Sequence, residues 1–246
     1  MPAPYFLITN KLRAATILSE ATVTDFGFAN ALDGRTSTQA GFASGAGREV
    51  VFDFGSAQTV SHIGHAAHSL AGSTMALHSS TNNSTWTLRL SWVAQAGAYT
   101  YELGTSFSAR YLRLTVTPAS GTVYVADFFA GQAIALPYGM PFGFVPPEFG
   151  DDDQVETNMT GNGAIVGTTV TRRPKKCSVD LRDYPASWFD TNWLTLTEGL
   201  KRYPGYFLWG DGKRPMFCSL DRKAPRASYS NHLHMSAKLE LEGFVE

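Results

Sequence analysis

Histidine is the first side chain to consider for chemistry, because imidazole can bind metals and transfer protons near neutral pH. Three of the six histidines are close together in the chain, at His62, His65 and His68. On a helix, their rings could share one face and hold a metal ion. The segment begins with the strand-like pair Thr59 and Val60, however, and in a strand-turn His65 points away from His62. The sequence therefore favours a structural role for these rings over a metal site.

A second pair of histidines, His232 and His234, would project from one face of a strand. No acidic or cysteine ligand lies beside them in the sequence, so we expect a solvated strand face. The chain also lacks a Gly-x-Ser-x-Gly elbow, a phosphate-binding loop, a dinucleotide fingerprint, a zinc-protease helix and paired-cysteine motifs. We therefore predict that the protein is not an enzyme.

The two cysteines, Cys177 and Cys218, are too few for the disulfide framework of a small secreted protein. Each lies in an alternating, strand-like segment. A buried free thiol is the usual state of such a residue, and a single bridge between the two is the alternative. The sequence thus predicts free cysteines.

Length and charge limit the function classes further. The chain has 246 residues, of which 43% are hydrophobic, enough for two hydrophobic cores. Its 20 basic and 21 acidic residues give a net charge of -1, which provides no overall attraction to nucleic acid or to an anionic membrane. The first residues lack a basic region followed by a long apolar stretch. We therefore expect no nucleic-acid binding, no membrane insertion and no classical secretion signal.

The first half has the pattern of half-buried strands. Val50, Phe52 and Phe54 alternate with polar or small residues, and Leu112 and Leu114 lie in a similar alternation. Clusters of Gly, Ser, Thr, Asn and Asp separate these segments, and no long helical stripe occurs before residue 186. This pattern predicts an antiparallel sandwich.

Six motifs in this half follow one another in the order of the discoidin, or coagulation-factor C-type, domain. The chain resembles this family in an Asp-Gly turn, four strand or turn motifs and a closing acidic-aromatic strand. The matching segments are Asn30 to Gly34, Val50 to Gly55, Thr59 to Ser61, Ser79 to Trp86, Ala109 to Leu114, and Ala126 to Gly131. The resemblance implies a galactose-binding-like jelly roll over residues 1–132, a fold that mostly displays ligand-binding loops.

The same resemblance implies a structural calcium ion beside the Asp-Gly turn. The positions that would supply oxygen ligands are Asp33, Arg35, Thr38 and Asp127. The alternative is that Asp33 simply caps its own turn.

Eukaryotic members of this family usually carry an end-to-end disulfide. The absence of this disulfide here points to a microbial or viral relative made in a reducing cytoplasm.

Residues 133–150, which we call the arm, have a different composition. Prolines at positions 137, 141, 146 and 147 exclude a helix or a central strand. Aromatic residues such as Tyr138, Phe142 and Phe144 make the arm too apolar for a free linker, so we expect it to pack on a neighbouring domain or subunit. The acidic residues Asp151 to Asp153 that follow are expected in a solvated loop.

The last part, residues 151–246, predicts strands around one helix. Thr169 to Leu181 resembles a strand broken by Pro174, and Ala186 to Tyr203 has apolar residues at helical spacing. Gly210 to Arg214 is a polar, glycine-containing segment suited to a hairpin turn, and His232 to Glu242 alternates as a final strand. The fold class we predict is therefore mainly β: a jelly-roll sandwich followed by a small β domain with one helix.

This order of elements resembles the tail-tube-type domain of phage distal and minor tail proteins. The resemblance implies a ring-forming structural component of a phage tail tip or baseplate. Its partners would be copies of itself, other tail proteins and a host-surface glycan. Its location would be the virion, after assembly in the host cytoplasm. The alternative function is a stand-alone carbohydrate-binding module of a microbial adhesin or polysaccharide-degrading system.

Overall fold

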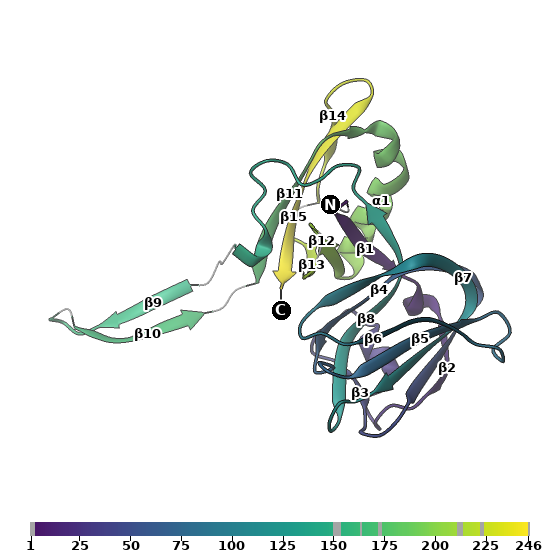
Figure 1. Ribbon diagram of the computed structural model, residues 1–246. Coiled ribbons are helices and arrows are strands. Elements are labelled where there is room, and N and C mark those ends of the chain that lie inside the picture. The colour runs from purple at the N-terminus through teal and green to yellow at the C-terminus, as the bar shows by residue number, and fades with distance from the viewer. Residues whose placement is uncertain are drawn as a thin grey trace.

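The structure is a computed structural model that describes residues 3–149, 154–162, 164–171, 174–210, 214–221 and 224–245. The predicted acidic loop at residues 151–153 lies outside these ranges. Figure 1 shows a β-sandwich, a smaller domain beside it that carries the helix, and a two-stranded hairpin that projects away from both.

Residues 5–135 form the sandwich, and its paired strands are all antiparallel. The mainly β sandwich class predicted from the sequence is confirmed. Two long strands, β4 and β7, pair along most of their length and shift register between Asp53 and Gln58. The strands are β1 (Tyr5–Asn10), β2 (Thr16–Glu20), β3 (Ala40–Phe42), β4 (Arg48–His68), β5 (Thr74–Ser80), β6 (Thr87–Val93), β7 (Tyr99–Thr117) and β8 (Val123–Ala135), with 3-10 turns η1 (Lys11–Ala14) and η2 (Phe28–Ala31).

Phenylalanine rings fill the centre of the sandwich. Phe28 makes edge-to-face contacts with Phe42, Phe52 and Phe128 at centroid distances of 6.1, 5.2 and 6.0 Å. All four side chains are fully buried. The alternation that predicted the strands therefore places one face of each strand in a common core.

The described part of the C-terminal domain contains one α-helix, as predicted. Helix α1 (Ala186–Arg202) buries Phe189, Leu196 and Leu200, and it ends before the extended residue Tyr203. The segment predicted as a strand broken at Pro174 forms two strands, one before this proline and one after it. The remaining elements are β9 (Gln154–Met159), β10 (Ile165–Thr171), β11 (Lys175–Pro185), β12 (Gly205–Leu208), β13 (Met216–Leu220), β14 (Ala227–Tyr229), β15 (His234–Phe244) and the 3-10 turn η3 (Pro147–Phe149).

Strand β1 joins the two domains. It pairs with β8 of the sandwich on one side and with β12 of the C-terminal domain on the other. Its residues Phe6 and Ile8 belong to the C-terminal core. Ile8 lies so close to Gly199 that a Cβ atom added to Gly199 would clash with the Ile8 side chain. The boundary expected at residue 132 falls within β8, so one sheet continues across it. The division into residues 1–132, 133–150 and 151–246 stays a prediction, as does independent folding of residues 1–132.

The arm is only partly packed. Phe144 contacts Phe207 edge-to-face at 6.3 Å, and Tyr138 contacts Tyr184 at 5.2 Å. Phe142 and Phe149, in contrast, are exposed. The expectation that the arm packs on a neighbouring domain is thus met by Phe144 and Tyr138, whereas the two exposed rings face away from the described chain.

Candidate functional site

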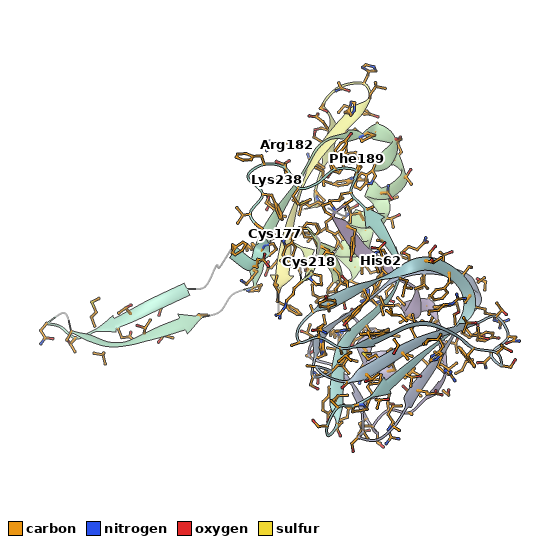
Figure 2. The ribbon with its side chains drawn as sticks, viewed as in Figure 1. His62, Cys177, Arg182, Phe189, Cys218 and Lys238 are labelled. Carbon is orange, nitrogen blue, oxygen red and sulfur yellow. The ribbon has the colours of Figure 1, made fainter. Side chains whose placement is uncertain are left out.

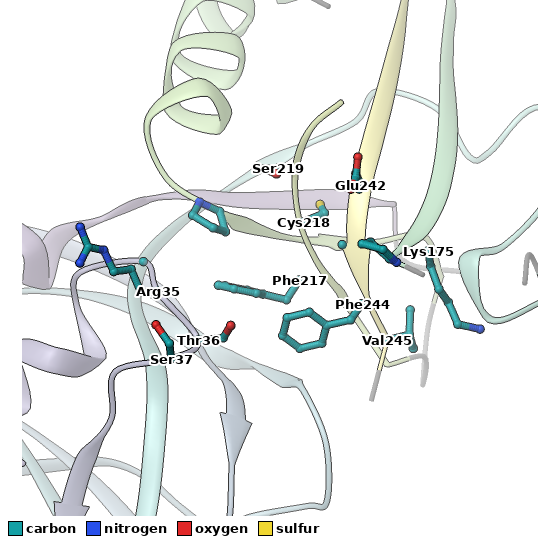
Figure 3. Close-up of a pocket in the computed structure, with 14 residues that line it drawn as sticks. Arg35, Thr36, Ser37, Lys175, Phe217, Cys218, Ser219, Glu242, Phe244 and Val245 are labelled. Carbon is teal, nitrogen blue, oxygen red and sulfur yellow. The ribbon is translucent and has the colours of Figure 1, made fainter. Parts of the chain in front are cut away.

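A cleft of about 1060 Å³ lies between the sandwich and the C-terminal domain (Figure 3). The sandwich supplies the turn after Asp33, and the C-terminal domain supplies the ends of β11, β13 and β15. The residues that line the cleft are Gly34, Arg35, Thr36, Ser37, Pro174, Lys175, Pro204, Phe217, Cys218, Ser219, Glu242, Gly243, Phe244 and Val245.

Two aromatic rings form one wall of the cleft. Phe217 on β13 and Phe244 on β15 are register partners, and their ring centroids lie 5.4 Å apart. Phe217 is buried and Phe244 is half-buried, so the exposed part of the wall belongs mainly to Phe244. Gly243 has no room for a Cβ atom, because the Phe217 carbonyl lies directly against it. This close approach of the two strands keeps the rings side by side.

Polar side chains from both domains complete the cleft. Arg35, Thr36 and Ser37 are exposed, and Lys175 and Glu242 are half-buried. The cleft therefore combines an apolar wall with hydroxyl, cationic and anionic groups.

The Asp33 turn is held by its own hydrogen bonds. The Asp33 carboxylate accepts one from the Arg35 backbone N–H at 2.8 Å and one from the Thr38 hydroxyl at 2.6 Å. Gly34 has a φ of 78°, and a Cβ atom there would lie 3.0 Å from the Tyr203 ring. Only glycine suits this position, because both its backbone angle and the nearby ring disfavour a side chain.

Asp127 lies at the junction of the two domains, close enough to Asp33 for the two carboxylates to interact electrostatically. Its Oδ1 is 3.1 Å from Arg13 Nη2, and its Oδ2 accepts a hydrogen bond from the Tyr206 hydroxyl at 2.6 Å. Burial raises the pKa of Asp127 to about 6, although the Arg13 guanidinium and the Tyr206 hydroxyl act in the opposite direction. The Asp127 carboxyl group is therefore paired with a cation of the chain.

The residues predicted as calcium ligands thus form two hydrogen-bonded groups. Asp33, Arg35 and Thr38 bond to one another, which matches the turn-capping alternative, while Asp127 bonds to Arg13 and Tyr206. Among the residues that the structure describes, no cluster of three or more His, Cys, Asp or Glu side chains could hold a metal ion. The sequence interpretation missed Arg13, because 114 residues separate it from Asp127.

The histidine segment lies within β4. His62 packs on the Tyr5 ring at 4.8 Å, whereas His65 packs on His68 at 4.4 Å. His65 is fully buried, and neither of its ring nitrogens has a hydrogen-bond partner. Desolvation, together with the nearby His68, lowers the pKa of His65 to about 3. This ring is therefore a neutral core residue.

Cys177 and Cys218 are both buried free thiols, as predicted, and they lie in the C-terminal domain (Figure 2). Burial raises the pKa of Cys177 to about 12 and also raises that of Cys218. Thiols of this kind are unreactive near neutral pH.

No helix in the described part of the chain is long and apolar enough to cross a membrane.

Comparisons with known proteins find similarity only at the level of structure. No family model and no curated protein matches the chain. CpGH89CBM32-6 from Clostridium perfringens is similar over 50% of this chain and 99% of its own, with 15% identity and a TM-score of 0.43. Chitosan-binding module 1 of a chitosanase/glucanase from Paenibacillus sp. IK-5 matches 50% of this chain and 99% of its own, with 20% identity and a TM-score of 0.42.

A third similar structure is the CBM32 of AlyQ in complex with 4,5-unsaturated mannuronic acid. It matches 52% of this chain and 96% of its own length, with 19% identity and a TM-score of 0.39. Solved structures with similarity over about half of the chain thus include carbohydrate-binding modules.

Proposed function

We propose that this protein is a non-enzymatic carbohydrate-binding protein, and that the cleft between its two domains binds the glycan. The observation that carries this proposal is the half-buried Phe244 ring opposite the hydroxyl groups of Thr36 and Ser37. One face of a sugar ring is lined by C–H groups and packs on an aromatic ring, while its hydroxyl groups need donors and acceptors. Arg35 can donate hydrogen bonds, and Glu242 can accept them.

The same residues argue against glycoside hydrolysis in the cleft. Most glycosidases use two carboxyl groups on opposite sides of the scissile bond, separated by roughly 5 to 9.5 Å. Among the described residues that line the cleft, Glu242 is the single carboxylate. The cleft can therefore hold a sugar without the second group that cleavage requires.

Binding can be measured by calorimetry with soluble oligomers of neutral hexoses, amino sugars and uronic acids. We expect at least one class to bind, and we expect Phe244→Ala to weaken that binding about tenfold or more, because a buried sugar–aromatic contact is lost. Phe142→Ala is the matched control, because it removes an exposed ring outside the cleft. Absence of binding to every class, or equal binding by Phe244→Ala, would contradict the proposal.

A second candidate function is a ring-forming component of a phage tail tip or baseplate. The projecting hairpin favours it (Figure 1). Strands β9 and β10 pair only with each other among the described strands, and they expose Met159 and Val166. An isolated two-stranded hairpin is marginally stable in water, so a neighbouring subunit is a natural partner for it. In this setting the sandwich would face outward toward a host-surface glycan, and the C-terminal domain would contact other tail proteins.

Mass photometry over a range of concentrations separates the two candidates. A ring component should form oligomers that the double variant Met159→Ser, Val166→Ser disrupts, because the apolar contact area is removed. Leu194→Ser is the control, because this leucine is equally exposed but lies on α1. If the protein is a monomer at every concentration, the ring-forming function is contradicted and only the carbohydrate-binding function remains.

A further inference from the structure

A single arginine connects the Asp33 turn region, the sandwich core and the C-terminal domain. Arg13 Nε donates a hydrogen bond to the Leu32 carbonyl at 2.9 Å, and Nη2 lies 3.1 Å from Asp127 Oδ1. The side chains of Arg13 and Asp127 are only 12% and 2% exposed. This is a buried ion pair with an additional hydrogen bond, not a surface contact.

Two tyrosines of the C-terminal domain complete the network. The Arg13 guanidinium lies over the Tyr203 ring, 4.1 Å from its centroid, and the Tyr206 hydroxyl donates to the second Asp127 oxygen. A guanidinium is well suited to this position, because it can donate hydrogen bonds and stack on a ring simultaneously. The network therefore crosses from one domain to the other.

These contacts do not fit a calcium ion at the same place. Calcium takes six to eight oxygen ligands, and carboxylates supply its charge balance. Here Asp127 already faces a guanidinium, and both Asp33 oxygens accept hydrogen bonds from its own turn. An ion bound to Asp127 would have to displace Arg13 or lie next to its positive charge, which is costly when both are buried.

We propose that Arg13 supplies, from within the chain, the positive charge that the family resemblance assigns to calcium, and that it locks the two domains together without a metal. Gly34 lies beside this network: a Cβ atom there would be 3.5 Å from Arg13 Nη2 and 3.2 Å from Pro204. Both Gly34 and Pro204 line the cleft. The lock therefore fixes the two walls of the cleft relative to each other.

The metal-free part of the proposal can be tested on the unaltered full chain. We expect the same melting temperature in millimolar calcium chloride and in excess EGTA, because a ligand that does not bind the native state cannot stabilise it. A higher melting temperature in calcium that Asp33→Asn or Asp127→Asn abolishes would overturn the proposal.

The lock itself is tested by comparing two ion pairs. Arg13→Met leaves a buried carboxylate without its cation and should lower the melting temperature by about 10 °C. Arg110→Met is the matched control, because Arg110 pairs with Asp53 at 2.9 Å but is 46% exposed; its effect should be only about 1 °C. Equal effects of the two variants would overturn the lock.

A double variant distinguishes a specific pair from general damage. Arg13→Met combined with Asp127→Asn should cost less than the sum of the two single variants, because each removes the partner of the other. Arg13→Lys provides a milder test if Arg13→Met does not fold. Lysine at this position keeps the positive charge but lacks the planar guanidinium group. We therefore expect a melting temperature between those of the unaltered chain and Asp127→Asn. If the loss in the double variant equals the sum of the losses in the two single variants, the proposal is contradicted.

Discussion

The central phenylalanines of the sandwich and two phenylalanines of the arm have opposite environments. Phe28 and Phe52 are fully buried at the centre of the sandwich, whereas Phe142 and Phe149 in the arm are 107% and 75% exposed. The side chain is the same in both regions, so its apolar character alone does not decide where it lies. The difference comes from the backbone that carries the ring.

Strands place every second residue on the same face, so a regular alternation gathers phenylalanines into one core. From residue 136 onward the arm has no such alternation, and its prolines prevent it from joining a sheet. Its rings are therefore free to point in different directions, and two of them find no cover in the described chain. Exposed rings of this kind are typical of surfaces that contact another molecule.

The largest expected effect is in the sandwich. Phe28→Ala removes a ring that contacts three other buried phenylalanines. We expect it to lower the free energy of unfolding by about 3 to 5 kcal/mol, because it removes buried apolar area and leaves a cavity. Urea unfolding measures this effect. Phe42→Leu, which keeps much of the volume, should cost clearly less; equal losses would show that the cost does not follow the volume removed.

A second prediction concerns acid stability, and it depends on His65. Burial holds the pKa of this ring at about 3 in the folded chain, against an ordinary value of 6.5. The unfolded chain therefore binds more protons than the folded chain between these values, and stability falls as the pH drops below 6.5. We expect His65 alone to cost about 2 kcal/mol between pH 7 and pH 5.

His65→Leu is the control for this effect, because it removes the titrating ring and its two unpaired nitrogens but keeps an apolar side chain. Its free energy of unfolding should change less between pH 7 and pH 5 than that of the unaltered chain. Parallel pH profiles for the two proteins would show that other groups cause the acid sensitivity.

Local patterns were sufficient to predict much of the fold. The alternation around Phe52 and Leu112 predicted the strands of the sandwich, and the apolar spacing after Ala186 predicted the helix. The two roles of β1 could not be predicted in this way. Phe6 and Ile8 pack in the C-terminal core, although this core is formed by residues more than one hundred positions away.

The candidate site was less accessible to sequence analysis. The hydrogen bonds of the Asp33 turn are local, and they were foreseen as the alternative to calcium. The pairs Arg13–Asp127 and Phe217–Phe244 depend on the register of distant strands. No motif marks such pairs, because side chains meet across strands only once the sheet has formed.

A smaller effect on stability is expected at the domain junction. Tyr206→Phe removes the hydroxyl that donates to Asp127 Oδ2 and leaves that buried oxygen unsatisfied. We expect a loss of about 1 to 2 kcal/mol in the free energy of unfolding. Tyr229→Phe removes the hydroxyl of an exposed tyrosine and is the control. Equal values for the two variants would mean that the hydroxyl contributes nothing to the junction.

The smallest effect on folding, and the sharpest contrast with the sandwich, is expected for Phe142. Because this ring is exposed, Phe142→Ser removes no contact with the core, and we expect a change of about 0.5 kcal/mol or less in the free energy of unfolding. If the ring contacts a second copy or another protein, the same change should weaken that association measurably, because a large apolar side chain is lost from the interface. Analytical ultracentrifugation of the unaltered chain and the variant at matched concentrations tests this difference. Phe144→Ser, which instead removes a ring that packs on Phe207, should show the reverse pattern of lower stability. If both variants lost stability equally and neither changed association, the arm would behave like the sandwich, and the contrast between the two regions would fail.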